Sequence, residues 1–247
     1  MNALDRFTAP VRAWFEESFG RPTPAQAQGW PPIQAGEHTL LLSPTGSGKT
    51  LAAFLWGLDR LFAELAEGER GAGVRLLYVS PLKALNNDIE RNLRRPLSGV
   101  RAAAARLGQA LPELRVAVRT GDTPSRLRAS MAKNPPHILI TTPESLYLIL
   151  TSSKAREMLR TVRTVIVDEI HTVAGNKRGV HLALSLERLE RLAGHPVQRI
   201  GLSATQRPLE EVAHYLGGQA WQGEQLEPRP VTIVDAGLAK ALDLQVV

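Results

Sequence analysis

Residues 43–50 have the sequence Ser-Pro-Thr-Gly-Ser-Gly-Lys-Thr, in which two glycines stand before a lysine and a hydroxyl residue. An apolar, strand-like run precedes the segment and a helical pattern follows it, which is the context that a phosphate-binding loop requires. Glycines such as Gly46 and Gly48 let backbone amides close around phosphate oxygens, and the following helix points its positive end at them. Lys49 would neutralise the β- and γ-phosphates of a nucleotide, and the Thr50 hydroxyl would bind magnesium. We therefore predict that a nucleotide is bound by Thr45, Gly46, Ser47, Gly48, Lys49 and Thr50.

An acidic pair follows another strand-like run far downstream, where residues 165–167 lead directly into Asp168 and Glu169. Ligands in open α/β sheets bind beyond the carboxyl ends of the strands, and these carboxylates would lie there. We expect Asp168 to hold magnesium, usually through water, and Glu169 to orient and deprotonate the water that attacks the γ-phosphate. An acidic pair after a strand is by itself more often a solvated turn, so this prediction depends on the phosphate loop.

The elements that must position these groups are short apolar runs that alternate with longer helical patterns. Several runs are apolar on consecutive residues, as buried parallel strands are. The runs predict strands at 39–42, 74–80, 114–118, 137–141, 162–167 and 197–202. The helical patterns lie at 51–66, 81–97, 124–133, 143–150, 180–192 and 208–216. This alternation predicts an α/β fold, with a mostly parallel sheet flanked by helices on both faces.

Four pairs of a hydroxyl residue and a proline indicate where helices begin. The hydroxyl can accept a hydrogen bond from a free amide of the first turn, and proline is tolerated at the first helical position. The pairs are Thr23-Pro24, Ser80-Pro81, Thr123-Pro124 and Thr142-Pro143. Nearer the amino terminus, Trp14, Phe15 and Phe19 have helical spacing and are most simply a packing face.

Composition excludes several classes of protein. The chain has 247 residues, 43% of them hydrophobic and 22% charged, so a packed core is expected and disorder is not. The absence of cysteine excludes disulfides, thiolate metal sites and cysteine nucleophiles, and fits a reducing compartment. The six histidines have no metal-ligand spacing, so a protein-bound zinc is not expected. The sequence has no export signal and no apolar run long enough to cross a bilayer.

The charge of the chain favours a polyanionic partner. The formal net charge is +6, and residues 81–133 contain 11 lysines and arginines against 4 acidic residues. The rest of the chain has 19 basic residues against 20 acidic ones, so the excess lies between the two nucleotide motifs. One positive face that follows a nucleic-acid backbone is therefore expected. Aromatic residues are only 5%, so we expect base stacking to contribute little and base sequence not to be distinguished.

Three segments together, 43–50, 168–171 and 203–205, resemble motifs I, II and III of superfamily 2 helicases of the DExH type. Other segments resemble that family's adenine-reading Q motif, its motif Ia and its next two nucleic-acid contacts. In that order they are Phe19 with Pro22, Thr23 and Gln26, then residues 81–85, 120–122 and 141–146. Arg178 and Gly179 follow His171 after six residues, in the run TVAGNKRGVHLALSLERL, and this resembles the large helicase-related (Lhr) family.

The resemblance implies roles for individual residues. Phe19 and Gln26 would contact the adenine, and Phe19 could stack on the base. His171, Ser203 and Thr205 would couple the nucleotide state to the grip on nucleic acid. The catalytic residues would be Lys49, Asp168, Glu169 and His171. Nucleic acid would be contacted by Pro81, Lys83, Gly121, Thr142, Pro143, Glu144 and Arg178.

The resemblance also implies a RecA-like domain, the first motor lobe of an ATP-dependent helicase that uses ATP and Mg²⁺. The parent protein would move 3′ to 5′ on single-stranded DNA and unwind duplexes, with RNA and DNA–RNA hybrids as further partners. It would act in DNA repair in the cytoplasm, associated with the nucleoid at most and with no membrane partner.

The expected organisation has three parts. N-terminal helices with the Q-motif-like segment occupy 1–36, the ATP-binding domain occupies 37–217, and residues 218–247 begin a connection to a second motor domain. Leu242, Leu244 and Val246 alternate with polar or small residues like a strand without a turn, so we expect the natural chain to continue. Since we find no motif of a second lobe, the chain alone should bind ATP and nucleic acid but hydrolyse ATP poorly.

Two alternatives stay open at this point. The chain could be a nucleotide-gated nucleic-acid-binding module, in which ATP changes strand affinity without unwinding. It could also be another phosphate-loop enzyme, such as a small-molecule kinase, although the basic excess and the ordered segments would have no use there. One departure loosens the phosphate-loop pattern, because Ser43 stands where the first glycine is usual.

Overall fold

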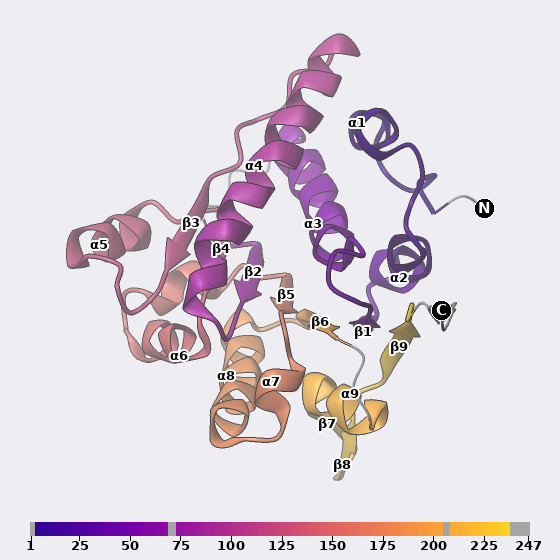
Figure 1. Cartoon of the computed structure of the whole chain (residues 1–247). Coiled ribbons are helices and arrows are strands. Elements are labelled where there is room, and N and C mark those ends of the chain that lie inside the picture. Colours follow the sequence, from indigo (N-terminus) through magenta and orange to yellow (C-terminus); the bar gives the residue numbers. More distant parts are fainter. Residues whose placement is uncertain (1–2, 69–72, 205–207, 238–247) are drawn as a thin grey trace, which may run out of the picture.

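The computed structural model describes residues 3–68, 73–204 and 208–237, which form a sheet with helices on both faces (Figure 1). The strands are β1 (His38–Leu42), β2 (Leu76–Val79), β3 (Val116–Arg119), β4 (Ile138–Thr141), β5 (Thr164–Val167), β6 (Gln198–Ser203) and β9 (Val231–Asp235). Their order is β3-β4-β2-β5-β6-β1-β9, and every pairing among them is parallel. The carboxyl ends of all seven strands therefore lie on one edge of the sheet, and the predicted α/β fold is confirmed.

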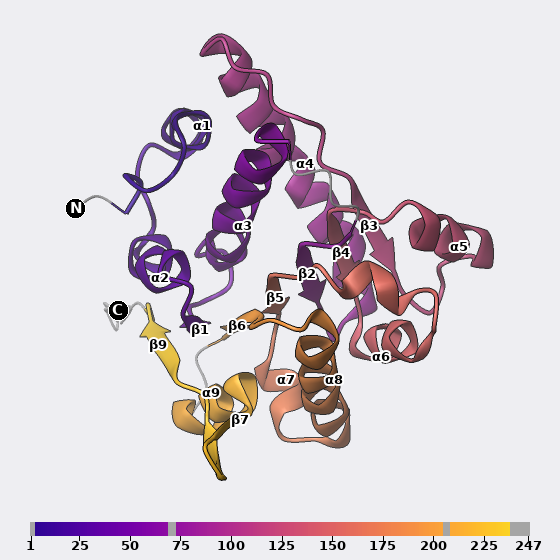
Figure 2. The same ribbon diagram turned by 180° about the vertical axis from the view of Figure 1, so that it is seen from behind.

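Two groups of helices cover the two faces (Figures 1 and 2). One face carries α1 (Ala9–Phe19), α2 (Pro24–Gln34), α3 (Lys49–Ala66) and α4 (Lys83–Arg106). The other carries α6 (Pro143–Thr151), the 3₁₀ helix η1 (Arg156–Leu159), α7 (His171–Ala174), α8 (Lys177–Ala193) and α9 (Leu209–Gly217). The helix α5 (Ser125–Lys133) has no buried residue and lies at the β3 end of the sheet.

Alternate strand residues explain why the apolar runs are continuous. In β1, Leu41 packs with the helices α1 to α4, whereas Leu40 and Leu42 pack with the opposite group. In β2, Tyr78 belongs to the first core and Leu77 to the second. Because successive side chains of a strand point to opposite faces, a strand buried on both sides needs apolar residues at every position.

The hydroxyl–proline pairs predict two helix starts correctly and two incorrectly. Thr23 and Thr142 each precede a helix whose first turn contains proline, and each accepts a hydrogen bond from the backbone amide of the third helical residue. Ser80 instead accepts from the Leu82 amide, and the helix α4 begins only at Lys83. Thr123 Oγ1 accepts from the Thr120 amide at 2.9 Å, so the hydroxyl closes the turn before α5 instead of capping the helix.

The structure adds elements that the apolar runs did not indicate. A two-stranded antiparallel hairpin, β7 (Gln219–Gln222) with β8 (Gln225–Pro228), precedes β9. Since β9 pairs with β1, the sheet includes part of the segment 218–247 that the sequence assigns to a connection. The expected strand at 242–246 lies outside the described residues.

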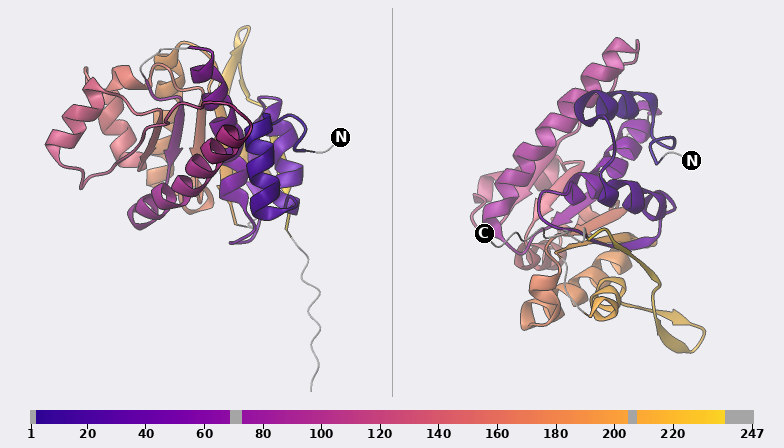
Figure 3. Two further views of the ribbon diagram at one scale, coloured as in Figure 1. Left: turned by 90° about the horizontal axis from the view of Figure 1, so that it is seen from above. Right: turned by 45° about the vertical axis from the view of Figure 1, so that its right-hand side comes forward.

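Long α4 links the sheet to the N-terminal helices. The two further views in Figure 3 show α4 extending beyond the sheet to reach α1, where Arg106 and Glu17 pair at 2.5 Å. Among the described residues, no helix is both long enough and apolar enough to cross a membrane.

Candidate nucleotide and nucleic-acid site

The predicted phosphate loop joins the carboxyl end of β1 to the first turn of α3. Gly46 and Gly48 have positive φ angles of 81° and 84°, which other residues adopt only with strain. Gly48 is the N-cap of α3, so the free amides of this helix face the loop. Lys49 is the first residue of α3 and is only 6% exposed, while Thr45 and Gly46 are exposed at the tip of the loop.

The Q-motif-like segment touches this loop directly. Thr23 Oγ1 donates to the carbonyl of Ser47 at 2.7 Å, and Gln26 Nε2 lies 3.4 Å from the carbonyl oxygen of Gly48. A Cβ at Gly48 would come within 2.7 Å of Gln26 Nε2, so glycine lets the two segments approach. Thr23 and Gln26 also form a reciprocal capping box at the start of α2, which fixes both side chains.

Phe19 lies in an aromatic cluster near the end of α1. Its ring centroid is 5.6 Å from that of Trp14 and 5.1 Å from that of Phe15, and the Arg95 guanidinium lies 5.8 Å from the Phe19 ring. Trp14 and Phe15 are buried, as a packing face should be, whereas Phe19 is 45% exposed. Its half-exposed ring leaves the stacking role of Phe19 a prediction.

Five of the residues around the loop form a closed circuit of polar contacts. Lys49 Nζ donates to the Ser43 carbonyl at 3.2 Å and lies 3.8 Å from Glu169 Oε1. The other Glu169 oxygen lies 3.5 Å from His171 Nε2, and His171 Nδ1 lies 3.1 Å from Ser203 Oγ. The circuit closes where the Ser43 amide donates to the Ser203 carbonyl at 3.2 Å. The structure therefore brings together residues from each of the three segments 43–50, 168–171 and 203–205.

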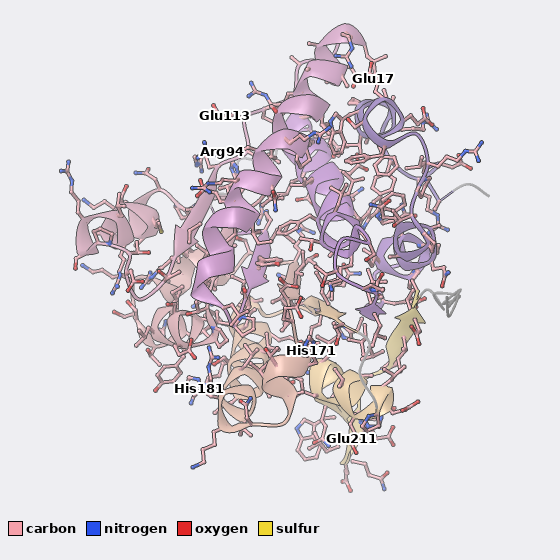
Figure 4. All side chains as sticks on the ribbon, viewed as in Figure 1. Glu17, Arg94, Glu113, His171, His181 and Glu211 are labelled. Atoms are coloured by element: carbon pink, nitrogen blue, oxygen red, sulfur yellow. The ribbon has the colours of Figure 1, made fainter. Side chains whose placement is uncertain are left out.

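His171 takes its place in this circuit from the short helix α7. His171 is the first residue of α7, which follows the acidic pair after Ile170, and Figure 4 marks its place at this helix. Glu169 has a φ of 45° and is the one non-glycine residue with positive φ in the described part of the chain. Such strained backbone often occurs at functional sites, and Glu169 is the residue that contacts both Lys49 and His171. Thr205, the last residue of the predicted coupling segment, lies outside the described residues.

Asp168 has a partner that the sequence did not indicate. The Tyr78 hydroxyl, at the end of β2, donates to Asp168 Oδ2, and the Glu169 amide donates to Oδ1 at 3.0 Å. Asp168 is 5% exposed, and burial raises the pKa of its carboxyl above the usual value despite these hydrogen bonds. Burial likewise raises the pKa of Tyr78 well above its usual range. The one sequence signal was a tyrosine among aliphatic residues in a fully buried strand.

We expect Tyr78→Phe to lower the free energy of unfolding by about 2 kcal/mol. The substitution leaves a buried carboxylate without its side-chain donor, and a hydrogen bond to a charged group contributes about 1.5–3 kcal/mol. Urea denaturation would measure the change. Tyr147→Phe is the matched control, because its hydroxyl has no hydrogen-bond partner among the described residues, and we expect a change within about 0.5 kcal/mol. Equal stability of Tyr78→Phe and wild type would contradict a stabilising role for this contact.

The loop residues fit a nucleotide with magnesium. The hydroxyls of Ser43 and Ser47 are buried and have no hydrogen-bond partner within the described residues, so both remain available to a ligand. A Cβ at Gly46 would meet no atom within 4 Å, which leaves open space above the loop. Lys49 supplies the buried positive charge, and Thr50 and Asp168 supply the hydroxyl and carboxylate that magnesium prefers. These side chains would hold the phosphates and the metal ion.

Three of the predicted nucleic-acid contacts meet at the same edge of the sheet. Arg178, near the start of α8, donates through Nε to Glu144 Oε1 at 2.7 Å and through Nη2 to the Pro81 carbonyl at 2.9 Å. Partial burial is the largest single influence on the pKa of Glu144 and would raise it, but the hydrogen bond and charge of Arg178, with the hydrogen bonds from the Glu144 amide and the Thr142 hydroxyl, together lower it. Arg178 therefore ties the loop before α4 to the first turn of α6.

The remaining predicted nucleic-acid contacts lie on neighbouring segments. Thr142 caps α6 and accepts from the Ser145 amide at 3.3 Å, and Pro143 is the first residue of that helix. Gly121 is exposed in the loop after β3, where its carbonyl accepts from Arg128 at 2.6 Å. Lys83 begins α4, but its side chain is not among those described. The residues of this edge thus form two groups, one around Arg178 and one around Gly121.

Comparisons with known proteins agree with the arrangement of these segments. The sequence profile of DEAD/DEAH box helicases matches residues 23–212. The chain is 58% identical over 243 residues to a protein of Mycolicibacterium smegmatis named Lhr helicase/probable uracil glycosylase, covering 98% of this chain and 15% of that protein. It is 53% identical to the ATP-dependent helicase Lhr-Core of Methanothermobacter thermautotrophicus, covering 96% of this chain and 27% of that protein.

Solved structures are similar as well. The Lhr helicase of Mycobacterium smegmatis, solved bound to ssDNA and AMP-PNP, matches 96% of this chain with a TM-score of 0.87 and 56% identity. The match covers 29% of that chain. The DEAD-box helicase Mss116, bound to ssRNA and UDP-BeF, matches with a TM-score of 0.72 at 16% identity, which supports the fold alone. The chain thus spans less than a third of the Lhr proteins that it matches.

Proposed function

The chain belongs to the DEAD/DEAH box helicase family, and from this premise we propose that it is the ATP-binding first motor lobe of an Lhr-like, ATP-dependent nucleic-acid helicase. The observation that carries the proposal is the closed circuit of Lys49, Glu169, His171, Ser203 and Ser43. The circuit joins the phosphate loop to Glu169 of the acidic pair and to Ser203 at the end of β6. Such a circuit can relate nucleotide chemistry to movements elsewhere in a motor.

ATP with Mg²⁺ is the proposed cofactor. The amides at the start of α3 and the Lys49 ammonium would hold the phosphates, since both place positive charge at the loop. Magnesium, when bound by Thr50 and Asp168, would neutralise charge that develops on the phosphates. Glu169 would accept the proton of the attacking water, while His171 keeps one of its oxygens in place. Gln26 would read the adenine from its position beside Gly48, with Phe19 stacked on the base.

The edge around Arg178 would hold the nucleic-acid backbone. The hydrogen bonds of Arg178 keep the Pro81 loop and the first turn of α6 together. The free amides at the start of α6 can bind a phosphate. Lys83, Gly121, Thr142, Pro143 and Glu144 would complete this surface. Single-stranded DNA is the proposed strand, with RNA and DNA–RNA hybrids as further partners. Ser203 and Thr205 would relay the nucleotide state to this grip.

The parent protein would unwind duplexes by 3′ to 5′ movement, inside the cell and in DNA repair. We place the Q-motif-like helices at 1–36, the ATP-binding domain at 37–217 and the connection to a second RecA-like lobe at 218–247. A nucleotide-gated binding module without unwinding is the alternative. The two functions differ in what they require of Glu169. A helicase would lose its activity when Glu169 can no longer accept a proton, whereas a binding module would keep its nucleotide-dependent affinity for the strand.

We expect Arg178→Gln to weaken single-stranded DNA binding by this chain about tenfold, equivalent to about 1.4 kcal/mol. Glutamine lacks the second arm that reaches the Pro81 carbonyl, so the two binding segments lose their common support. Fluorescence anisotropy with a labelled oligonucleotide would measure the change, and nucleotide affinity should stay the same.

Arg106→Gln is the matched control for this measurement. Arg106 also forms an exposed pair with a glutamate from a distant segment, but it lies at the far end of α4. Because α4 has 24 residues, this pair lies about 35 Å along the helix from the edge of the sheet where the strands end and where Arg178 lies; we call that edge the strand edge. Equal losses in the two variants would contradict a specific role for Arg178.

A further inference from the structure

A strip of aromatic and basic side chains runs along the contact between α6 and α8, away from the strand edge. It begins where Arg178 pairs with Glu144. One helical turn further, the rings of Tyr147 and His181 lie 4.5 Å apart, and Figure 4 shows His181 on the side of α8 nearest α6. The Arg188 guanidinium then lies 5.8 Å from the centre of the Tyr147 ring. We call Tyr147, His181, Arg156, Arg160, Arg188 and Arg191 the α6–α8 seam.

The far end of the seam is a surface hollow lined by four arginines. Arg156 and Arg160 come from the segment around η1, and Arg188 and Arg191 come from the last two turns of α8. All four side chains are exposed. Since each guanidinium keeps its charge at any physiological pH, the hollow has a permanent positive potential.

Few acidic groups oppose this charge. Glu157 lies 3.5 Å from Arg156 and 2.6 Å from Arg160, so it partly neutralises that pair. The acids of α8 are bound elsewhere, because Glu187 and Glu190 both pair with Arg199 and Arg229. In the part of the chain that the structure describes, no carboxylate lies within 4.0 Å of the guanidinium of Arg188 or Arg191.

This arrangement explains why the charge count along the sequence gave no sign of the seam. Outside residues 81–133 the basic and acidic residues nearly cancel. In the folded chain, however, they separate: Asp168 and Glu169 lie at the nucleotide site, and Glu187 and Glu190 pair on the side of α8 toward β6 and β9. The arginines of the seam remain at the surface.

We propose that the α6–α8 seam binds the backbone phosphates of nucleic acid that extends beyond the strand edge around Arg178. This inference rests on the proposed function. From Arg178 to Arg191 the helix α8 rises about 20 Å, since each residue adds about 1.5 Å. A single phosphate cannot contact both ends of that distance, whereas six base pairs of duplex, at about 3.4 Å per step, span it. Continuity with the proposed strand site favours a nucleic-acid backbone over an acidic peptide.

The test reverses two charges of the seam in Arg188→Glu/Arg191→Glu. Three labelled DNAs would be titrated into this chain: a single strand of eight nucleotides, a single strand of thirty, and an eight-nucleotide tail joined to a twelve-pair duplex. We expect binding of the shortest strand to change least, because few of its phosphates extend past Arg178 onto the seam once the residues around Arg178 are occupied. Binding of a longer DNA should weaken by about tenfold or more, and its salt slope should fall by about 0.7–0.9 per lost phosphate contact.

The two longer DNAs distinguish the form of nucleic acid on the seam. A loss confined to the tailed duplex assigns the seam to duplex, and a loss for the thirty-nucleotide strand assigns it to single strand. Arg60→Glu is the matched control, because Arg60 also lies exposed over an aromatic ring, 5.9 Å from Trp56, but on the opposite face of the sheet. We expect this control to bind all three DNAs as wild type does.

Two results would overturn the inference in different ways. If Arg178→Gln weakens binding of every DNA while the seam variant binds all three normally, nucleic acid binds around Arg178 but does not contact the seam. If wild type binds none of the DNAs at any salt concentration, the proposed function itself fails together with the seam. A loss in Arg60→Glu of about half the logarithmic loss of the seam variant would also reject the seam, because one reversed charge against two would then account for both through net charge alone.

Discussion

ATP turnover by this chain alone should be about 10³–10⁵ times slower than by a longer protein in which it is joined to a second RecA-like lobe. Phosphoryl transfer in motors of this kind depends on positive charge opposite the γ-phosphate, and an arginine supplied from a second element gives about that acceleration. Among the described residues, the lysine beside Glu169 is Lys49, which belongs to the phosphate loop itself. It would therefore bind the phosphates from the loop and not from the opposite side.

Steady-state turnover with and without single-stranded DNA would measure this difference. Nucleotide affinity serves as the internal control, since both proteins contain the same phosphate loop and should bind an ATP analogue with comparable affinity. Strong, strand-stimulated turnover by this chain alone would mean that its own residues already complete the catalytic set.

A second large effect is expected for Glu169→Gln in the two-lobed protein, where turnover should fall by about 10²–10⁴. Glutamine has almost the same shape but cannot take a proton from the attacking water, and general base catalysis contributes a factor of that size. The contact with Lys49, 3.8 Å in the wild type, is weak, so its loss should change nucleotide binding little. Single-turnover hydrolysis would isolate the chemical step.

Glu113→Gln is the matched control for this substitution. Glu113 is exposed and precedes β3, and Figure 4 shows it beside α4, well away from His171. This variant should hydrolyse ATP at the wild-type rate. If Glu169→Gln also does, the nucleotide-gated binding module becomes the better account.

The strands and the phosphate loop could be predicted because their signals are local. A strand buried on both faces is apolar at consecutive positions, and the glycines at 46 and 48 meet a backbone requirement of the loop itself. Because parallel strands end on one edge of the sheet, the acidic pair after β5 could be assigned to the edge that carries the loop. The short distances around Lys49 and Glu169 follow from that topology.

The contacts that could not be predicted join residues whose partners only the fold specifies. Tyr78 meets Asp168 because β2 and β5 are neighbours in the sheet, and nothing in the sequence around Tyr78 indicates which strand lies beside it. Arg178 and Glu144 were each predicted, but their pairing depends on how α6 and α8 pack. The strand β9 was missed because five residues after a proline-rich turn resemble a connection as much as a strand.

The measurement that tests the central claim most directly is binding of a fluorescent ATP analogue to this chain in the presence of Mg²⁺, with Lys49→Ala as the comparison. Lys49 is buried against the loop and supplies its positive charge, so the account predicts saturable binding by wild type and a loss of affinity of about a hundredfold or more in the variant, equivalent to about 2.7 kcal/mol. Equal affinity of the two proteins, or no binding by wild type, would contradict the assignment of residues 43–50 as the nucleotide site.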